Sequence, residues 1–220
     1  MIDILQTGDE LYIKNWNLDY IIGIDEAGRG TLAGPVVASA VAISSENLFS
    51  QIWHQEPLQY IKDSKKVTPK RRQAIYDNIQ NQNEVLIGIV SLSAHNIDTI
   101  NILEATKIAW LEALERCLLQ LPLDSKIGIL IDGNIIPSGI EYPHQAVIKG
   151  DNKHLSIALA SIYAKVYRDN IMTVYHTQYP NYGFNENKGY GTKLHIEAIQ
   201  KYGITDIHRV TFCKNYNLKS

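Results

Sequence analysis

The sequence predicts an α/β fold, because short apolar strands alternate along it with long helices. Runs rich in Val, Ile, Leu and Ala have the length of strands and lie at 20–26, 35–43, 84–93 and 126–132. Apolar residues recur at helical spacing over 96–120 and 153–177. Strands that alternate with long helices are typical of a sheet covered by helices.

The composition is that of an ordinary globular protein with one core. We expect a single domain over residues 1–220. The net charge of −2 gives no overall basic signal, so a polyanion would have to be held by local patches. Cys117 and Cys213 lie in no metal-binding spacing, and we find neither a secretory h-region nor an apolar run of membrane-spanning length. We therefore expect a reduced, cytoplasmic protein without a membrane segment.

The first predicted strand ends in two adjacent acids, Asp25 and Glu26, and the glycine-rich turn Gly28-Arg29-Gly30 joins it to the second. A buried carboxylate is costly unless it is paired or bound to a metal. The acidic dipeptide alone therefore fits either a capped turn or the start of a metal site. Glycine lets the backbone approach a ligand closely, so the N–H groups of this turn could hold a phosphate or a sugar. Arg29 by itself also fits a solvated turn.

The densest basic segment is KDSKKVTPKRR at 62–72, with six cations and one acid. Thr68 followed by Pro69 predicts the start of a helix that runs to about residue 80. Such a run fits either a solvated helix start or a phosphate-binding patch. We expect solvation for the three cations that follow Pro69.

The predicted strand at 126–132 ends in an acid, Asp132, as the first strand does. A second strand that ends in an acid makes a cluster of carboxylates plausible. The helix before it, at 96–120, ends ahead of Pro122, and its Trp110 is expected in the core rather than as a platform for base stacking.

Further candidates lie on the last long helix and in the loop after it. Ser161, Lys165 and Asp169 follow one another at intervals of four, so they share one stripe of the helix. Asp169 alone rather fits an exposed acid paired with Lys165 or Arg168. Tyr190 lies between two glycines and is either exposed or packed under its loop with the hydroxyl bonded.

The remaining predicted elements are a short helix or variable arm at 1–19, a short strand at 146–150, an N-cap at Asp151-Asn152, a loop at 178–190 and a helix at 192–202 ended by Gly203. None of these carries a chemical role by its own pattern.

Six ordered motifs resemble those of the prokaryotic type 2 ribonuclease H family, ribonuclease HII. They are GIDEAGRG with LAGPVVASAV at 23–41, DSKK at 63–66, IDGN at 131–134, ASIYAKVYRD at 160–169, NKGYGTKLH at 187–195 and HRVTF at 208–212. The resemblance covers roughly residues 20–212. It departs from the family pattern at Thr31, where proline is usual, and at Thr211, where serine is more usual; neither position is a carboxylate.

The resemblance implies a ribonuclease-H-like fold and a nuclease activity. The fold is a mixed central β-sheet flanked by helices, with a helical C-terminal part from about 178 to 220. The activity is endonucleolytic cleavage of the RNA strand of RNA–DNA hybrids and of single ribonucleotides embedded in duplex DNA. Cleavage falls 5′ of the ribonucleotide and leaves 5′-phosphate and 3′-hydroxyl ends by metal-assisted hydrolysis.

The resemblance also assigns roles to residues. The catalytic and metal-binding carboxylates are Asp25, Glu26, Asp132 and Asp169. Oxygen ligands select Mg²⁺ or Mn²⁺, and two ions would serve the reaction. The substrate-binding residues are Gly28, Arg29, Gly30, Lys65, Lys66, Lys165 and Tyr190. Of these, the Gly-Arg-Gly turn contacts the ribonucleotide with its 2′-hydroxyl, and Tyr190 stacks on the sugar of the following nucleotide.

The position of Asp25 next to Glu26 poses a geometric difficulty, because adjacent residues of a regular strand point to opposite faces. Both can serve one site only if the strand twists out at the turn or if Glu26 contributes its backbone carbonyl. The sequence leaves these alternatives open.

Two rival functions differ in what the sequence should lack. Another carboxylate-metal nuclease of the same fold, such as a DNA endonuclease or transposase, would lack a sensor for the 2′-hydroxyl. A non-catalytic hybrid-binding module would be expected to have lost a carboxylate, and all four are present. The expected partners are RNA–DNA hybrids and ribonucleotide-containing duplex DNA, bound by a monomer. The tail KNYNLKS shows no evident clamp-binding motif.

Overall fold

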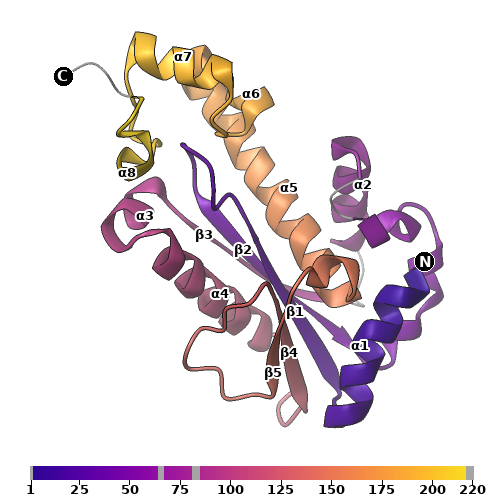
Figure 1. Ribbon diagram of the computed structural model, residues 1–220. Helices are drawn as coiled ribbons and strands as arrows, with labels where there is room; N and C mark the ends of the chain where they lie inside the picture. The colour runs from indigo at the N-terminus through magenta and orange to yellow at the C-terminus, as the bar shows by residue number, and fades with distance from the viewer. Residues whose placement is uncertain (1, 64–66, 81–84, 217–220) are drawn as a thin grey trace.

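The structure is a computed structural model that describes residues 2–63, 67–80 and 85–216 (Figure 1). Lys65 and Lys66, expected to contact phosphate, lie outside the described residues.

A mixed five-stranded sheet in the order β3-β2-β1-β4-β5 forms the centre of the molecule (Figure 1). Its strands are β1 (Tyr20–Ala27), β2 (Val36–Ser44), β3 (Val85–Leu92), β4 (Ile127–Asp132) and β5 (His144–Val147). β2 is antiparallel to both β1 and β3, whereas β4 is parallel to β1 and β5. The predicted α/β class and mixed sheet are confirmed. The prediction of the last strand at 146–150 was wrong by about two residues.

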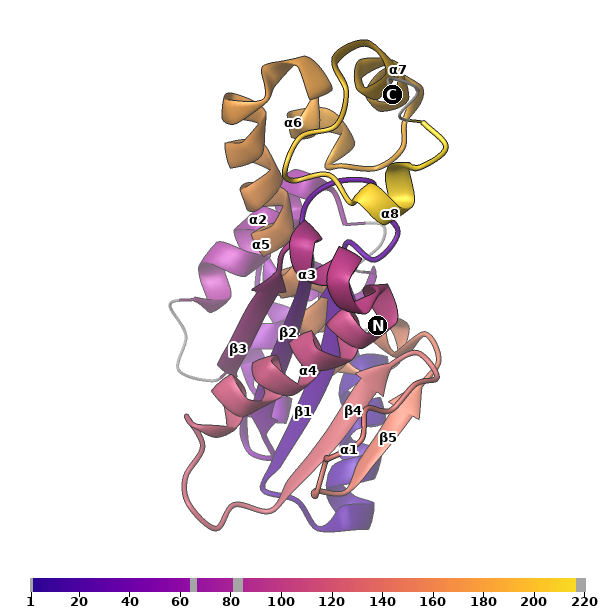
Figure 2. The same cartoon turned by 90° about the vertical axis from the view of Figure 1, so that its left-hand side faces the viewer.

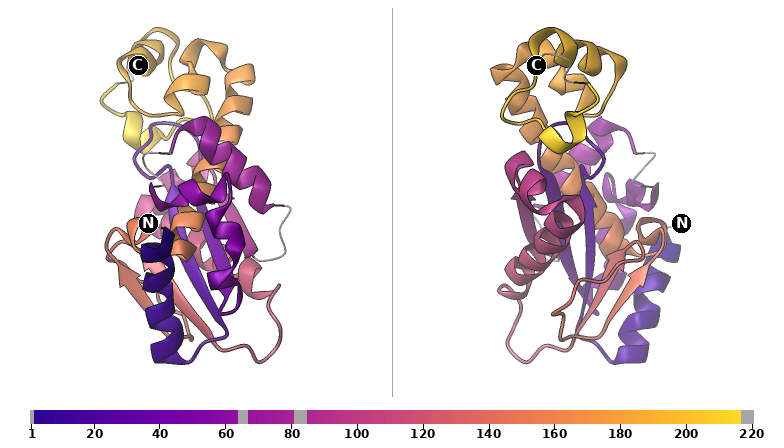
Figure 3. Two further views of the ribbon diagram at one scale, coloured as in Figure 1. Left: turned by 90° about the vertical axis from the view of Figure 1, so that its right-hand side faces the viewer. Right: turned by 60° about the vertical axis from the view of Figure 1, so that its left-hand side comes forward.

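Helices cover both faces of the sheet (Figures 2 and 3). Successive strand residues face opposite sides, so Ile22 and Ile24 of β1 belong to the core with Trp110 of α4 (Ile102–Leu118). Ile21 packs on the other side, in the core that includes α5 (Leu155–Gln178). Helices α1 (Ile2–Trp16) and α2 (Pro69–Ile79) lie on this second side. Thr68 caps α2, as predicted. Among the described residues, no helix is long and apolar enough to cross a membrane.

The predicted single helix at 96–120 was wrong, because the chain breaks at Asn101. The structure has α3 (Ala94–Ile100) and then α4. Asn101 has a φ of 67°, which lies in the left-handed region, and its side chain accepts hydrogen bonds from the N–H groups of Leu103 and Glu104. Asparagine tolerates this backbone and is a good N-cap, so it ends one helix and starts the next.

The predicted cap of the last long helix at Asp151-Asn152 was also wrong. These residues form the 3₁₀ turn η4 (Gly150–Asn152), and the N-cap of α5 is His154. The carboxylate that serves this helix end is Asp9 of α1, which is fully buried and accepts from the Ser156 N–H at 2.8 Å and its hydroxyl at 3.0 Å. The N-terminal segment is therefore a docked helix and not a loose arm.

Short helices complete the chain. Three 3₁₀ turns, η1 (Asn47–Phe49), η2 (Gln51–His54) and η3 (Leu58–Asp63), lie between β2 and α2. The C-terminal part consists of η5 (Pro180–Tyr182), α6 (Phe184–Asn187), α7 (Lys193–Tyr202) and α8 (Val210–Cys213). It packs around the far end of α5, next to the turn between β1 and β2 (Figures 1 and 2). Helix α7 starts after Thr192 and ends at Gly203, as predicted.

Candidate active site

A cleft of about 520 Å³ lies where the end of β1 meets α2, α5 and the loop before α7. It is lined by residues from all four segments, including the sequence candidates Glu26, Gly28, Arg29, Gly30, Lys165 and Tyr190. Ser161 and Arg72 also line it. Ser161 shares the helical stripe of Lys165, but its sequence pattern indicates no role, and the pattern around Arg72 predicts a solvated cation. Nothing in the basic run distinguishes a cation that faces a cleft from one that faces solvent.

Asp25 and Asp132 meet because their strands are parallel neighbours that end at the same edge. Ile24 is paired with Ile131, so the next residue of each strand carries its acid to this edge. Burial, followed by repulsion from Glu26 and Asp132, raises the pKa of Asp25 well above its usual range. The Gly150 N–H donates to Asp132 Oδ1 at 2.7 Å, and the Glu26 N–H donates to Asp25 Oδ1 at 2.7 Å. Each carboxylate is thus oriented by a backbone N–H.

Glu26 points to the opposite face of the sheet from Asp25. The Trp110 indole on α4 donates to Glu26 Oε2 at 3.0 Å, and Arg29 approaches Oε1 at 3.4 Å. Asp25 instead accepts a hydrogen bond from Ser161 on α5. Burial raises the pKa of Glu26, while Arg29 and the Trp110 N–H oppose this shift and Asp132 adds to it. Trp110 is in the core, as predicted, and it also holds a candidate ligand.

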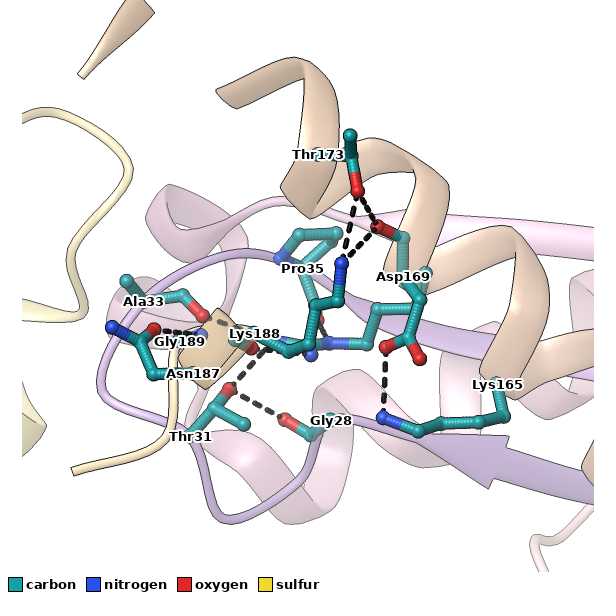
Figure 4. Close-up of polar contacts among 11 residues, drawn as sticks. Gly28, Thr31, Ala33, Pro35, Lys165, Asp169, Thr173, Asn187, Lys188 and Gly189 are labelled. Carbon is teal, nitrogen blue, oxygen red and sulfur yellow. Dashed lines mark hydrogen bonds and ion pairs between the residues drawn. The ribbon is translucent and has the colours of Figure 1, made fainter. Parts of the chain in front are cut away.

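Asp169, on α5, is paired with a cation (Figure 4). Lys165 Nζ donates to Asp169 Oδ1 at 2.7 Å. Lys188 Nζ lies 2.9 Å from Thr173 Oγ1 and 3.4 Å from the Asp169 carbonyl oxygen. Asp169 lines a smaller hollow of about 150 Å³, and Arg72 lines both this hollow and the cleft. Pairing of Asp169 with Lys165, one of the alternatives that the sequence left open, is therefore observed.

The four carboxylates do not form a closed ligand set. Among the described residues, no three His, Cys, Asp or Glu side chains are close enough together to hold an ion. The donors nevertheless fit a divalent cation. Asp25 and Asp132 lie at one sheet edge, and burial, followed by repulsion from Glu26 and Asp132, raises the pKa of Asp25; a cation would relieve that repulsion. Carboxylate oxygens are the ligands of Mg²⁺ and Mn²⁺.

Two buried arginines hold the turn between β1 and β2, and neither was identified from the sequence. Arg168 of α5 donates to the carbonyls of Ala33, Pro35 and Lys188 and to the Thr31 hydroxyl, at 2.8–3.0 Å (Figure 4). Arg209, just before α8, donates to the carbonyls of Gly28, Arg29 and Gly34. Both residues are 0 % exposed. They occur in the YRD and HRVTF motifs, but a motif does not say whether an arginine is buried.

The two arginines fix the orientation of the peptide groups in the turn. Arg209 draws the Gly28 and Arg29 carbonyls inward, and Arg168 draws in those of Ala33 and Pro35. No backbone carbonyl among the described residues accepts from the N–H groups of Gly28, Arg29 or Gly30. Gly28 has a φ of +92°, and a Cβ there would lie 2.0 Å from Arg168 Nε. The position therefore requires glycine.

The turn is also joined to the loop that carries Tyr190. The N–H groups of Leu32 and Ala33 donate to the Gly189 carbonyl at 2.8 and 3.3 Å. A Cβ on Gly189 would lie 2.3 Å from the Ala33 oxygen, so this close approach requires glycine too. Tyr190 is 45 % exposed, with Lys165 Nζ 5.7 Å from its ring centre. Of the two alternatives for Tyr190, the exposed one is observed.

Both departures from the family pattern make specific contacts. The Thr31 hydroxyl donates to the Gly28 carbonyl at 3.1 Å and accepts from Arg168 at 2.9 Å, which places it inside the network that holds the turn. Thr211 contacts Asp98 of α3 through its N–H and its hydroxyl, at the start of α8.

Comparison with known proteins identifies the family. The family model described as Ribonuclease HII matches residues 22–215. Ribonuclease HII of Chlamydia pneumoniae is 46 % identical over 192 residues, which cover 87 % of this chain and 82 % of that protein.

Solved structures share the fold. The ribonuclease HII in a PCNA complex from Archaeoglobus fulgidus has a TM-score of 0.70 at 24 % identity, covering 91 % of this chain and 98 % of that one. Bst-RNase HIII in complex with Mn²⁺ has a TM-score of 0.68 at 18 % identity, covering 94 % and 71 %. With the family model and the relative in agreement over most of the chain, this protein belongs to the ribonuclease HII family and is a ribonuclease H, a hydrolase.

Proposed function

We propose that this ribonuclease H, an endoribonuclease that cleaves RNA in RNA–DNA hybrids, also cleaves at single ribonucleotides embedded in duplex DNA. Cleavage falls 5′ of the ribonucleotide and leaves 5′-phosphate and 3′-hydroxyl ends. The observation that carries the proposal is the joining of the Gly28–Gly30 turn to Tyr190 through Gly189, beside the acidic sheet edge. Because the turn and Tyr190 are held together, each could contact one of two successive sugars, which suits the recognition of two neighbouring nucleotides.

The 2′-hydroxyl of the ribonucleotide would bind at the Gly-Arg-Gly turn. The N–H groups of Gly28, Arg29 and Gly30 are available as donors, because no backbone carbonyl among the described residues accepts from them and Arg209 holds the Gly28 and Arg29 carbonyls. A 2′-hydroxyl distinguishes RNA from DNA at one position. The exposed ring of Tyr190 would lie against the next sugar, where an added hydroxyl would crowd it. A site of this kind reads a junction from RNA to DNA.

The carboxylates supply the metal site of the proposal. Asp25 and Asp132 would hold a divalent ion between β1 and β4, with Glu26 contributing from the other face of β1 or through its carbonyl. Asp169 would join them once Lys165 turns toward the substrate phosphate. The family is metal-dependent, and we infer Mg²⁺ or Mn²⁺ from the oxygen donors. Two such ions, when bound, would activate the attacking water and stabilise the leaving 3′-oxygen.

Other parts of the proposal rest on narrower support. Both cysteines are free and buried, which agrees with a reduced cytoplasmic compartment. Four further expectations stay predictions. They are a single domain, a monomeric state, phosphate contacts by Lys65 and Lys66, and the absence of a clamp-binding motif. The complex with PCNA is a property of the Archaeoglobus fulgidus protein and is not assigned to this one.

The test is an assay with end-labelled duplex DNA that carries one ribonucleotide, with Mg²⁺, with Mn²⁺ and with a chelator. We expect metal-dependent cleavage on the 5′ side of the ribonucleotide and no cleavage of an all-DNA duplex. Tyr190→Ala should lower the rate on this substrate more than the rate on a uniform RNA–DNA hybrid. Cleavage of the hybrid alone, or on the 3′ side, would overturn the proposal of junction reading.

A further inference from the structure

Two buried histidines lie behind Tyr190 and have no role in the proposed function. His195 is in the first turn of α7 and is 0 % exposed, and His208, just before α8, is 2 % exposed. Their Nε2 atoms are 3.1 Å apart. Tyr182 and Phe184 pack against both rings, so the pair is fixed from η5 and α6 as well.

The hydrogen bonds determine where each proton of the pair lies. The Thr205 N–H donates to His208 Nδ1 at 3.0 Å, so this nitrogen is an acceptor and the His208 proton is on Nε2. His208 Nε2–H then donates to His195 Nε2, which leaves the His195 proton on Nδ1. His195 Nδ1–H donates to the Tyr190 carbonyl at 2.8 Å. The three hydrogen bonds therefore run in one direction, from Thr205 through His208 and His195 to the Tyr190 carbonyl.

Tyr190 is consequently held on both sides. The carbonyl before it, of Gly189, accepts from the Leu32 and Ala33 N–H groups of the turn. Its own carbonyl accepts from His195 and from the Thr192 N–H at 2.8 Å. Its side chain alone is free to meet a ligand in the cleft.

We propose that the His195–His208 pair is a positioning element for Tyr190, and that it sets the ability of the enzyme to distinguish an RNA-to-DNA junction from uniform RNA. His208 acts by fixing the tautomer of His195, and His195 acts by holding the Tyr190 carbonyl. Without the donor from His208, the His195 proton can move to Nε2, and the bond to Tyr190 is lost. The inference rests on the proposed role of Tyr190 as a reader of the second sugar.

The charges around the pair favour its neutral form. Burial lowers the pKa of His195, and burial followed by repulsion from His195 lowers the pKa of His208 to about 4. Asp206, on the segment before α8, opposes this shift of the His208 pKa. The Tyr182 hydroxyl, from η5, donates to the Gly203 carbonyl. A proton on His195 Nε2 would set two N–H groups against each other across 3.1 Å, and a proton on His208 Nδ1 would face the Thr205 N–H. Protonation of either ring therefore removes one hydrogen bond of the series.

The experiment measures the ratio of the cleavage rate on a single embedded ribonucleotide to the rate on a uniform hybrid. His208→Phe keeps an aromatic ring against Tyr182 but removes the donor to His195. We expect the ratio to fall by about fivefold, the factor set by one hydrogen bond. In a Tyr190→Ala background, His208→Phe should cause no further change of the ratio. His195→Asn, which keeps an N–H near the Nδ1 position, should retain more of the ratio than His195→Leu.

The matched control is Tyr182→Phe, which removes a buried hydrogen bond from the same cluster without touching the histidine series. It should lower the melting temperature and leave the ratio unchanged. A ratio that changes in Tyr190→Ala but not in His208→Phe would overturn this inference and keep the proposed function. A ratio that changes in neither variant would overturn both. Additive effects of His208→Phe and Tyr190→Ala would show that His208 acts elsewhere.

Discussion

Replacement of Arg209 by lysine tests whether buried cations set the recognition turn. Arg209 donates four hydrogen bonds to the carbonyls of Gly28, Arg29 and Gly34. Burial, followed by repulsion from Arg168, lowers the pKa of Arg209 to about 9, so it stays charged at neutral pH. Lysine lacks the planar fork and is more easily neutralised by burial, so Arg209→Lys leaves about two carbonyls without a donor.

The magnitude follows from those carbonyls. A buried polar group without a partner costs about 1–3 kcal/mol, so the variant should lose about 2–6 kcal/mol of its free energy of unfolding. Most domains have about 5–15 kcal/mol, so Arg209→Lys should still fold at low temperature. Once the carbonyls turn away, the N–H groups of the turn no longer face the 2′-hydroxyl. Selectivity should fall together with stability.

The assay combines denaturant unfolding with cleavage rates measured well below the melting temperature. Arg116→Lys is the matched control, because Arg116 also donates to a carbonyl, that of Ile89, but lies exposed on α4. We expect Arg209→Lys to lower the rate on a single embedded ribonucleotide at least tenfold, as expected when a bonded hydroxyl loses its donors. A variant that loses stability and keeps wild-type rates on both substrates would refute the reasoning.

Three further outcomes are expected. Asp132→Asn should abolish cleavage of both substrates and leave the melting temperature in chelator unchanged or raised, because it removes repulsion from Asp25; near-native turnover of the purified variant would show the site to be misassigned. Lys65→Ala should weaken binding of hybrid and of ribonucleotide-containing duplex alike, with a shallow dependence on salt, as titrations at several salt concentrations would show; an effect on one substrate alone would exclude a phosphate contact. His208 binds a proton in the unfolded chain near pH 6.5 but in the folded protein only near pH 4, so its stabilising contribution is complete above pH 6.5 and is lost as the pH falls toward 4, by at most about 3 kcal/mol. Unfolding at pH 7 and pH 5 should show this loss in the wild type, and a loss just as large in His208→Phe would contradict it.

The sequence predicts those parts of the site that follow from strand ends. Asp25 and Asp132 each close an apolar run, which makes a carboxylate cluster plausible, and the parallel pairing of β1 with β4 brings the two to one edge. The opposite faces of Asp25 and Glu26 also follow from the pleat alone. The structure adds the Trp110 donor that holds Glu26 on its own side.

Other features depend on partners that are distant in the chain. The α5 cap comes from Asp9, 147 residues before Ser156, and the local Asp151-Asn152 pattern gives no sign of it. The break at Asn101 rests on one left-handed residue that helical periodicity does not detect. Arg168 and Arg209 look like ordinary surface cations until their carbonyl partners are known, because burial of a charge is decided by tertiary contacts.

The location of these residues separates two tasks within one cleft. The acids that would hold metal lie on β1, β4 and α5, whereas the elements proposed to read sugars are held by Arg168, Arg209, His195 and His208. Three of these four holding residues come from the C-terminal part. A change at the acidic edge should therefore remove cleavage of every substrate, since the attacked phosphate is common to all. A change among the holding residues should alter the ratio between substrates first. Selectivity and chemistry are thus separable by mutation, even though Gly28 lies only three residues after Asp25.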